Sequence, residues 1–413
     1  MRAVLAPVGT RGDVQPMLAL GVALRRAGHE VSVCVAENHR ASVEALGLPY
    51  VRGGDDSQQL MTRTDIEVRG ALRFTKMGRA VEIGRIMMRE QFAAIEEAAR
   101  GAHLIVGTML TTAATSIAEH LGIPCFRACY FPASMATADL PSPLFAALGA
   151  PRVFNRATWG VHRFFENVGL RGLVNEYRVK RSLEPIEDVS AHVLARTTML
   201  MAFDTDFAPL PADWPPVHAT GYWCLESQEP LPAEVEEVLA SGEKTVYIGF
   251  GSMPSKDAAK RTAVLLDAVR EAGCRALVSS GEAGLGGGVR DPRCTVIGAV
   301  SHAALFPRVS AVVHHGGAGT TAAALRAGVP QIIAPHVFDQ HYWAARVRAN
   351  GLGPAPLPQG FTAGALASAL RETLADGAMA QRAREMASRV QVRGAQRAVE
   401  ILEEQVSALT SPR

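Results

Sequence analysis

The stretch AVVHHGGAGTTAAALRAGVPQIIAPHVFDQHYW, residues 311–343, decides the fold. It opens with an apolar run that ends in two histidines, and a loop of small residues, Gly316 to Thr321, then leads into an alanine-rich segment that reaches Arg326. This order predicts a strand, a tight turn and a helix. The start of such a helix presents unpaired backbone N–H groups and the positive end of its dipole, and glycine lets an anion approach the main chain. The expected ligand is therefore a phosphate or a diphosphate.

A second strand is predicted directly after this helix, from Gln331 to Ala334, and polar residues Asp339 and Gln340 follow it. Ligands of open α/β sheets bind at the carboxyl ends of the strands, so we expect these side chains at the same edge as the glycine loop. A carboxylate and an amide at that place can hydrogen-bond the hydroxyls of a sugar. Together with a diphosphate cradle they indicate a nucleotide sugar.

The motif HHGGAGTT, the Asp339–Gln340 pair with a nearby tryptophan, and the stretch GTRGDVQP at residues 9–16 resemble the GT-B glycosyltransferases of family 1. The similarity is strongest to bacterial natural-product enzymes of the vancomycin-pathway type and to sterol glucosyltransferases, and it covers nearly the whole chain. The resemblance implies an α/β, GT-B fold, in which two Rossmann-like doubly wound domains face each other across a cleft.

Length and composition fit this expectation. The chain has 413 residues, which suits two domains, and 48% of them are hydrophobic while 20% are charged, as in a soluble globular protein. A formal net charge of +2 gives no reason to expect nucleic acid as a partner. Six scattered cysteines without a CxxC pair indicate reduced thiols and a cytoplasmic protein. The N-terminal apolar run is too short for a signal peptide, and no later run suggests an integral membrane segment.

Strand and helix signals alternate along the chain in two series. The second series starts with the strand Thr245–Phe250 and repeats the opening of the first, which is a strand, a glycine-containing loop and a helix. A proline-dense stretch between the two series marks a linker. The expected parts are an acceptor-binding domain over 1–205, a linker over 206–232, a nucleotide-sugar donor-binding domain over 233–393, and, by resemblance, a C-terminal helix within 394–413 that packs back on the first domain.

Two segments of the first series, Gly53–Arg89 and Tyr130–Leu183, are less regular and rich in Met, Phe, Arg and Pro. On this fold such segments overhang the carboxyl edge of the sheet, where an acceptor would be held. The alternative is that they are ordinary surface helices and loops.

Asp13 stands between a predicted buried strand, Ala3–Pro7, and a helix predicted from Pro16 to Arg26. By position alone it is a helix-capping carboxylate, which contributes about 1 kcal/mol. The alternative is a general base at the mouth of the sheet. In the family that GTRGDVQP resembles, the aspartate serves as the base, and this favours the second role.

The resemblance also assigns the donor site. His314 matches the family histidine that contacts the α-phosphate, whereas His315 matches a position without an assigned role. Ser252 matches a serine that binds a diphosphate oxygen, and the backbone of Val300 meets the base. The expected catalytic residues are Asp13 and His314, and the expected donor-binding residues are Thr10, Arg11, Gly12, Ser252, Val300, His314, Gly316, Gly317, Ala318, Gly319, Thr320, Asp339 and Gln340.

Metal sites are the weaker interpretation of the same residues. The side chains of His314, His315, His336, Asp339 and His341 offer zinc ligands, but the strand, loop and helix around the first two favour an anion cradle. The sequence Asp204-Thr205-Asp206 spells DxD, which is typical of metal-dependent transferases of another fold, yet it stands at the end of a domain. We therefore expect no metal and no other cofactor.

These roles predict an inverting hexosyltransferase. Asp13 takes the proton from a hydroxyl of a hydrophobic small-molecule acceptor, such as a natural-product aglycone, and that oxygen attacks the anomeric carbon of a dTDP- or UDP-sugar. The alternatives are a sterol or lipid glucosyltransferase that uses UDP-glucose, a nucleotide-sugar 2-epimerase, and an inactive transferase that acts as a partner subunit.

Overall fold

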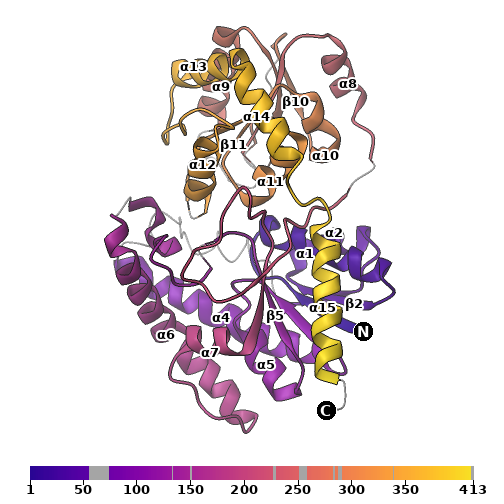
Figure 1. The fold of residues 1–413 in the computed structure, drawn as a ribbon, viewed down its shortest axis with the longest axis vertical. Helices are drawn as coiled ribbons and strands as arrows, with labels where there is room; N and C mark the ends of the chain where they lie inside the picture. The colour runs from indigo at the N-terminus through magenta and orange to yellow at the C-terminus, as the bar shows by residue number, and fades with distance from the viewer. Residues whose placement is uncertain are drawn as a thin grey trace. The chain divides into compact units, whose positions relative to one another are not determined.

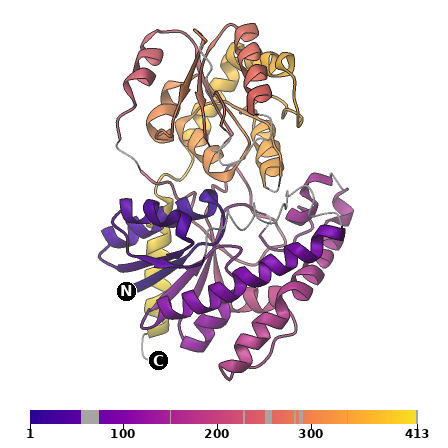
Figure 2. The same cartoon turned by 180° about the vertical axis from the view of Figure 1, so that it is seen from behind.

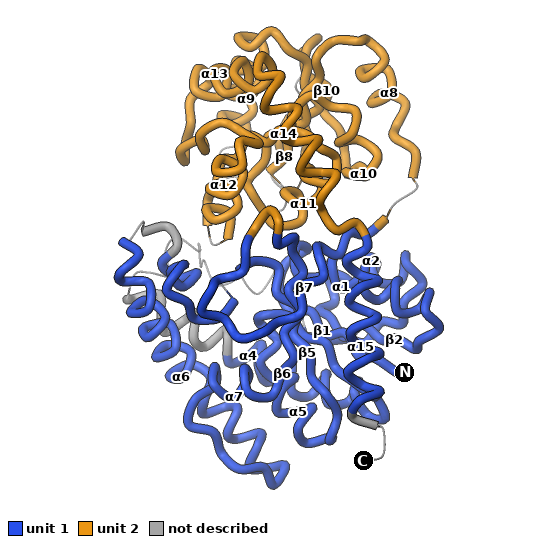
Figure 3. The backbone as a smooth tube through the Cα atoms, in the orientation of Figure 1, with its two compact units in different colours: residues 1–205, 209–225, 393–413 blue, residues 206–208, 226–392 orange. Residues whose placement is uncertain are grey.

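The structure is a computed structural model that describes residues 1–54, 74–132, 134–148, 151–226, 229–250, 258–281, 284–286, 291–337 and 339–410. It divides into two units, which Figure 3 shows in different colours. Unit 1 comprises Met1–Thr205, Pro209–Leu225 and Arg393–Arg413, and unit 2 comprises Asp206–Ala208 and Glu226–Val392. None of the described helices is long and apolar enough to cross a membrane.

Unit 1 is built around a seven-stranded parallel sheet in the order β3-β2-β1-β4-β5-β6-β7. Every residue of the neighbouring central strands β4 and β5 is buried. Such continuous burial is typical of a parallel sheet that is covered on both faces. The strands are β1 (Arg2–Ala6), β2 (Glu30–Val35), β3 (Tyr50–Arg52), β4 (Leu104–Gly107), β5 (Cys125–Cys129), β6 (Thr197–Met201) and β7 (His218–Ala219).

Helices cover both faces of this sheet. On one face Val4 and Ile105 share a core with side chains of α4, α5 and α6, and Figure 2 shows α4 running across that face. On the other face Leu5 meets Gly21 of α1, and α1 in turn packs against α15, which runs beside it in Figure 1. The helices of unit 1 are α1 (Arg11–Arg26), η1 (Glu37–His39), α2 (Arg40–Ala45), α4 (Phe74–Ala99), α5 (Ala113–Leu121), η3 (Pro143–Leu148), η4 (Arg152–Phe154), α6 (Asn155–Lys180), α7 (Val189–Arg196) and α15 (Gly394–Thr410).

The two segments that we expected to be irregular contain long helices. Tyr130–Leu183 includes the 26-residue helix α6, and Gly53–Arg89 runs into α4, while residues 55–73 lie outside the described part of the chain. Buried Met88, Phe92 and Ile95 recur at helical spacing and pack on the sheet, so this half of α4 is stabilised by its tertiary contacts.

Most of the proline-dense stretch that we expected as a linker over 206–232 packs on unit 1. Residues 209–225 belong to unit 1, because β7 adds to the sheet beside β6 and Trp223 is 1% exposed. The Trp223 indole N–H donates to Thr220 Oγ1 at 2.9 Å. A buried aromatic ring with a satisfied N–H holds this segment on the domain.

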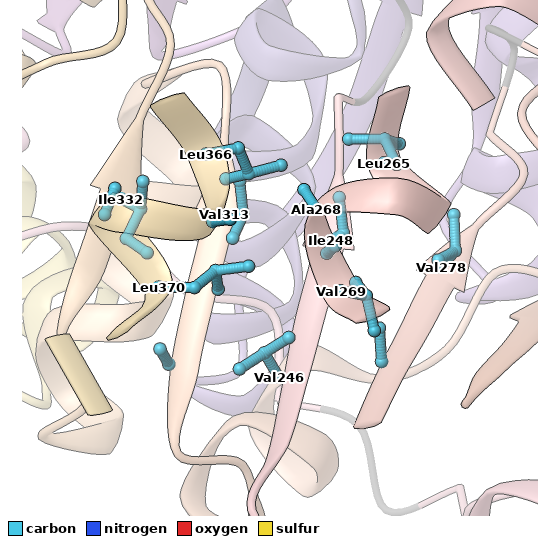
Figure 4. Packing of buried hydrophobic residues seen from close by; sticks show 14 of the residues in the cluster. Val246, Ile248, Leu265, Ala268, Val269, Val278, Val313, Ile332, Leu366 and Leu370 are labelled. Atoms are coloured by element: carbon cyan, nitrogen blue, oxygen red, sulfur yellow. The ribbon is translucent and has the colours of Figure 1, made fainter. Parts of the chain in front are cut away.

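Unit 2 is built around a five-stranded parallel sheet in the order β10-β9-β8-β11-β12. Figure 4 shows how Leu265 and Val269 of α9 and Leu366 and Leu370 of α13 pack over Val313 and its neighbours on the strands. The strands are β8 (Thr245–Gly249), β9 (Arg275–Ser279), β10 (Cys294–Ile297), β11 (Ala311–His314) and β12 (Gln331–Ile333), and the helices are α8 (Ala233–Ala240), α9 (Ala258–Ala272), α10 (His302–Leu305), η5 (Phe306–Arg308), α11 (Ala318–Ala327), α12 (Gln340–Ala349), α13 (Ala363–Ala375) and α14 (Gly377–Ala387).

The two sheets share one strand order. In unit 1 the order β3-β2-β1-β4-β5 corresponds, strand for strand, to β10-β9-β8-β11-β12 in unit 2. This confirms the predicted α/β class and the doubly wound form of both halves. In such sheets ligands bind at the carboxyl ends of the strands where the order reverses. The loops after β1 and β11 leave the sheets at these points.

Candidate functional site

The loop after β1 enters α1 through a capping box. Thr10 is the N-cap, and its backbone N–H donates to Asp13 Oδ2 at 2.9 Å while the Gly12 N–H donates to Thr10 Oγ1 at 3.3 Å. The helix therefore begins at Arg11, five residues before the predicted start, and Pro16 lies inside it. Asp13 is the third residue of the helix rather than its N-cap, and the structure shows a capping role for its carboxylate.

The environment of Asp13 also suits a base. A side chain at Gly9 would collide with Asp13 Oδ2, and Gly9 has φ +136°, so only glycine lets the chain turn this closely around the carboxylate. Tyr130 Oη, at the end of β5, donates to the Asp13 carbonyl at 3.1 Å. Burial raises the pKa of Asp13 to about 6, against the lowering effect of its hydrogen bonds to Thr10. A carboxyl with this pKa is ionised at neutral pH and is still basic enough to accept a proton.

His314, the last residue of β11, is fully buried and uses both ring nitrogens inside the protein. Its Nδ1 accepts the backbone N–H of Gly316 at 3.0 Å, and its Nε2 lies 2.9 Å from Gln331 Oε1 on β12. Since Nδ1 is an acceptor, Nε2 carries the proton and donates it to Gln331. Burial lowers the pKa of His314 to about 3, so the imidazole is neutral.

This geometry differs from the direct phosphate contact that the resemblance implied for His314. The one ring N–H already donates to Gln331, and the other nitrogen can only accept. His314 instead fixes the first residue of the glycine loop relative to β12. In this structure His314 positions the loop. Its hydrogen-bond partner Gln331 was not predicted from the sequence. Gln331 is a polar residue at the start of the otherwise apolar strand β12, and this pattern could have indicated a buried hydrogen bond.

The glycine loop leads into α11 as expected. Gly317 is the N-cap and no side chain caps the helix, so the N–H groups of Ala318, Gly319 and Thr320 form the open start of α11. The first-turn N–H groups and the helix dipole attract an anion. The loop, the strand end and the helix start thus form an open cradle of N–H groups, and phosphate binding there stays a prediction.

Asp339 and Gln340 lie directly beside this cradle. A Cβ at Gly316 would lie 3.1 Å from the Gln340 carbonyl oxygen, which shows that the two loops touch. Gln340 Oε1 accepts the N–H groups of His336 and Val337 at 2.8 and 3.2 Å. Asp339 Oδ2 accepts the indole N–H of Trp343 at 3.0 Å. These bonds hold both side chains at the carboxyl edge of β12, and their contacts to a sugar stay a prediction.

We expect Gly316→Ala to weaken nucleotide binding and to destabilise unit 2. Gly316 has φ +91°, and a Cβ there would lie 2.8 Å from Ile333 Cγ2. The left-handed backbone alone costs an alanine about 1–2 kcal/mol. Thermal unfolding and calorimetric titration with dTDP and UDP measure the two effects. The matched control is Gly364→Ala, because a Cβ at Gly364 meets nothing within 4 Å; equal behaviour of the two variants would contradict the role of Gly316.

The remaining predicted residues have these positions. Thr10, Arg11 and Gly12 are exposed at the start of α1. Val300 follows β10, directly before Ser301, which caps α10. Ser252 lies outside the described residues, so its role stays a prediction. Among the residues that the structure describes, no group of three or more His, Cys, Asp or Glu side chains is arranged to hold a metal ion.

Two family models match the chain. Residues 3–138 match the glycosyltransferase family 28 N-terminal domain, and residues 279–404 match the C-terminal domain of erythromycin biosynthesis protein CIII-like proteins. The chain is 36% identical, over 98% of its own length and 98% of the relative, to a vancomycin aglycone glucosyltransferase of Amycolatopsis orientalis. It is 32% identical, over 87% of its length and 58% of the relative, to the sterol 3-beta-glucosyltransferase UGT80A2 of Arabidopsis thaliana.

A solved structure shares the fold. The glycosyltransferase VinC, solved in complex with dTDP, superimposes with a TM-score of 0.72 at 21% identity. The match covers 99% of this chain and 100% of VinC. The fold and the chain-long sequence similarity therefore agree.

Proposed function

Because this chain belongs to the GT-B family 1 glycosyltransferases and is itself a glycosyltransferase, we propose that it moves a hexose from a dTDP- or UDP-sugar to a hydroxyl of a hydrophobic natural-product acceptor, with inversion at the anomeric carbon. The observation that carries the proposal is the uncapped start of α11 beside Asp339 and Gln340. It offers an anion cradle and hydroxyl-binding groups at one sheet edge. The solved relative VinC, which has dTDP bound, supports a thymidine diphosphate donor.

In this mechanism Asp13 accepts the proton of the acceptor hydroxyl while that oxygen attacks the anomeric carbon. The bond to the diphosphate breaks as the new glycosidic bond forms, and the N–H groups of Ala318, Gly319 and Thr320 bind the departing diphosphate. Preorganised donors at a developing charge contribute about 100- to 1,000-fold each. These groups supply positive potential without a metal ion, and we propose a metal-independent reaction. His314 contributes through the position of Gly316.

The relatives include a sterol glucosyltransferase, which favours UDP-glucose and a lipid acceptor as the second candidate function. That relative is 32% identical, and the chain spans 58% of its length. The two candidates differ in the acceptor, and a dTDP-sugar donor fits only the first. A donor test therefore comes first.

A thermal-shift panel of dTDP, UDP, ADP and GDP tests the function. A ligand at about 100 times its dissociation constant adds roughly 2.7 kcal/mol to the stability of the folded protein. A shift with dTDP would support the natural-product candidate, whereas a shift with UDP alone would fit both candidates and leave the acceptor to separate them. The absence of any shift would contradict a nucleotide-sugar donor. In a second experiment the protein is incubated with a nucleotide sugar and no acceptor. An epimerase would convert the sugar and release no nucleoside diphosphate.

Asp339→Ala separates the sugar from the nucleotide. We expect the variant to bind dTDP or UDP like wild type and to bind the corresponding glucose conjugate more weakly, because a sugar hydroxyl left without its acceptor costs about 1–3 kcal/mol. Calorimetric titration with both ligands gives the difference. An equal loss for both ligands would show that Asp339 acts on the loop as a whole, through its bond to Trp343.

A further inference from the structure

The side chain of Asp339 does not cap the helix that it precedes. Asp339 is the N-cap residue of α12, and an aspartate at this position commonly accepts an N–H of the first turn, but here the side chain makes no capping hydrogen bond. Its Oδ2 accepts the indole N–H of Trp343, one turn further along, at 3.0 Å. A carboxylate can accept about four hydrogen bonds, so this bond leaves capacity for the hydroxyls of a sugar. The Trp343 indole, rather than the first turn of α12, therefore orients the Asp339 carboxylate.

The Trp343 indole is held in turn by the ring of Phe207. Both residues are buried, with exposed fractions of 3% for Trp343 and 1% for Phe207. Their rings are stacked, with centroids 5.9 Å apart and planes that differ by 8°, which lies within the range that aromatic pairs prefer. Close packing of two buried rings restricts the indole to one orientation. The Phe207 ring therefore fixes the direction in which the Trp343 N–H points.

The main chain of Phe207 is tied to the same helix. Its carbonyl oxygen accepts Arg346 Nε at 2.9 Å and Arg346 Nη2 at 2.7 Å, and Asn350 Nδ2 donates to it at 3.4 Å. Hydrogen bonds from a charged donor are the stronger kind. α12 thus holds the carbonyl of Phe207 as well as its ring.

Phe207 lies in a short piece of chain between two parts of unit 1. Asp206–Ala208 belongs to unit 2, whereas Met1–Thr205 before it and Pro209–Leu225 after it belong to unit 1. Figure 3 shows these three residues in the colour of unit 2. This short excursion places one aromatic ring against Trp343, so a residue from the first half of the sequence supports the proposed sugar-binding carboxylate in the second.

We propose that Trp343 and Phe207 are positioning residues for the hexose: the Phe207 ring holds the Trp343 indole, and the indole N–H holds the Asp339 carboxylate in the orientation that accepts sugar hydroxyls. This inference rests on the proposed function, in which Asp339 binds the hexose. A carboxylate that is oriented in advance binds hydroxyls more tightly than one that must be ordered on binding. The nucleotide is bound by other groups, so the effect of both residues is confined to the sugar.

Trp343→Phe is the first test, because phenylalanine still packs on Phe207 but has no N–H for Asp339. The probe is dTDP-glucose or UDP-glucose, whichever the wild type binds more tightly in calorimetric titration. We expect the variant to bind this probe about tenfold more weakly and to bind the matching dTDP or UDP within about twofold of the wild type. Trp223→Phe is the matched control, since it loses an indole hydrogen bond of 2.9 Å to Thr220 at a similarly buried place in unit 1. Both ligands should bind this control as they bind the wild type.

A double-mutant cycle separates positioning from a purely structural role. In the Asp339→Ala background Trp343 has no carboxylate to orient, so we expect Trp343→Phe to cause no further loss of affinity for the glucose conjugate. Phe207→Leu keeps an apolar side chain and removes the stacked ring. We expect it to weaken the glucose conjugate about threefold or more and to leave dTDP or UDP binding unchanged. Thermal unfolding of each variant shows that it is folded at the temperature of the titration.

The outcomes that contradict the proposal are distinct. Equal losses of the nucleotide and of its glucose conjugate in Trp343→Phe would assign Trp343 to the stability of the loop and overturn its positioning role. Unchanged sugar affinity in Trp343→Phe, or losses that add in the double variant with Asp339→Ala, would overturn it as well. If Asp339→Ala alone lost the sugar selectively, the proposed function would stand without the positioning role. A wild type that bound neither nucleotide nor glucose conjugate would refute both.

Discussion

Asp13→Asn is expected to lower the turnover number by about 100- to 10,000-fold, the usual contribution of a general base. The substitution is chosen because Asp13 caps α1 in the structure and is the general base in the proposed function. Asparagine still accepts the Thr10 N–H through its side-chain oxygen, so the capping box of α1 is kept. It cannot take a proton from the acceptor. We therefore expect normal folding, normal binding of dTDP or UDP, and little transfer.

The pH profile gives an independent measurement of the same group. The pKa of Asp13 is raised to about 6, above its ordinary value. The base is active only when it is ionised, so kcat/KM for the wild type is expected to fall about tenfold per pH unit below pH 6 and to level off above it. For stability the sign is opposite, because a raised carboxyl pKa means that the folded state holds the proton more tightly than the unfolded state. Ionisation of Asp13 therefore costs stability as the pH rises from about 4 to above 6.

Asp376→Asn is the matched control for Asp13→Asn. Asp376 also caps a helix, since its Oδ1 accepts the Met379 N–H at 2.8 Å at the start of α14, and it lies outside the proposed site. This variant should transfer sugar at the wild-type rate. Comparable turnover of Asp13→Asn and the wild type, or an acid limb that persists unchanged in the variant, would return Asp13 to a capping role alone.

The strand, turn and helix of residues 311–327 could be predicted from the sequence because their signals are local. An apolar run, a glycine-rich turn and an alanine-rich helix follow each other without a break in residues 311–327, and the structure has β11 and α11 at these places. The helix predicted from Pro16 begins five residues earlier, at Arg11, because the Thr10–Asp13 capping box sets its start and Pro16 lies inside it. Hydrogen bonds between neighbouring residues decide where a helix begins, and the residues that form them here, Thr10 and Asp13, are visible in the sequence.

Other features depend on contacts between distant residues and could not be read from local patterns. The partner of His314 lies 17 residues away on the neighbouring strand, and only the sheet register brings Gln331 to it.

His314→Ala is expected to reduce both the stability of unit 2 and the affinity for dTDP or UDP. The variant leaves Gln331 Oε1 and the Gly316 N–H without partners in a fully buried place. Each such orphaned group costs about 1–3 kcal/mol. The loop that forms the cradle also loses its anchor to β11, so we expect at least a tenfold loss of nucleotide affinity, which corresponds to about 1.4 kcal/mol.

A double-mutant cycle with Gln331→Ala decides how His314 acts. If His314 positions the loop through Gln331, then each single variant leaves one member of the His314–Gln331 bond unpaired, and the double variant removes both members. The Gly316 N–H loses its partner whenever His314 is replaced. The stability loss of the double variant is then smaller than the sum of the two single losses by about 1–3 kcal/mol, and both single variants bind nucleotide more weakly. If His314 instead donates directly to a phosphate, Gln331→Ala frees that ring N–H and should bind dTDP or UDP at least as well as the wild type. Additive stability losses together with unimpaired nucleotide binding by Gln331→Ala would therefore restore the direct contact that the sequence resemblance implied, whereas coupled losses assign the phosphate to the main chain of the loop.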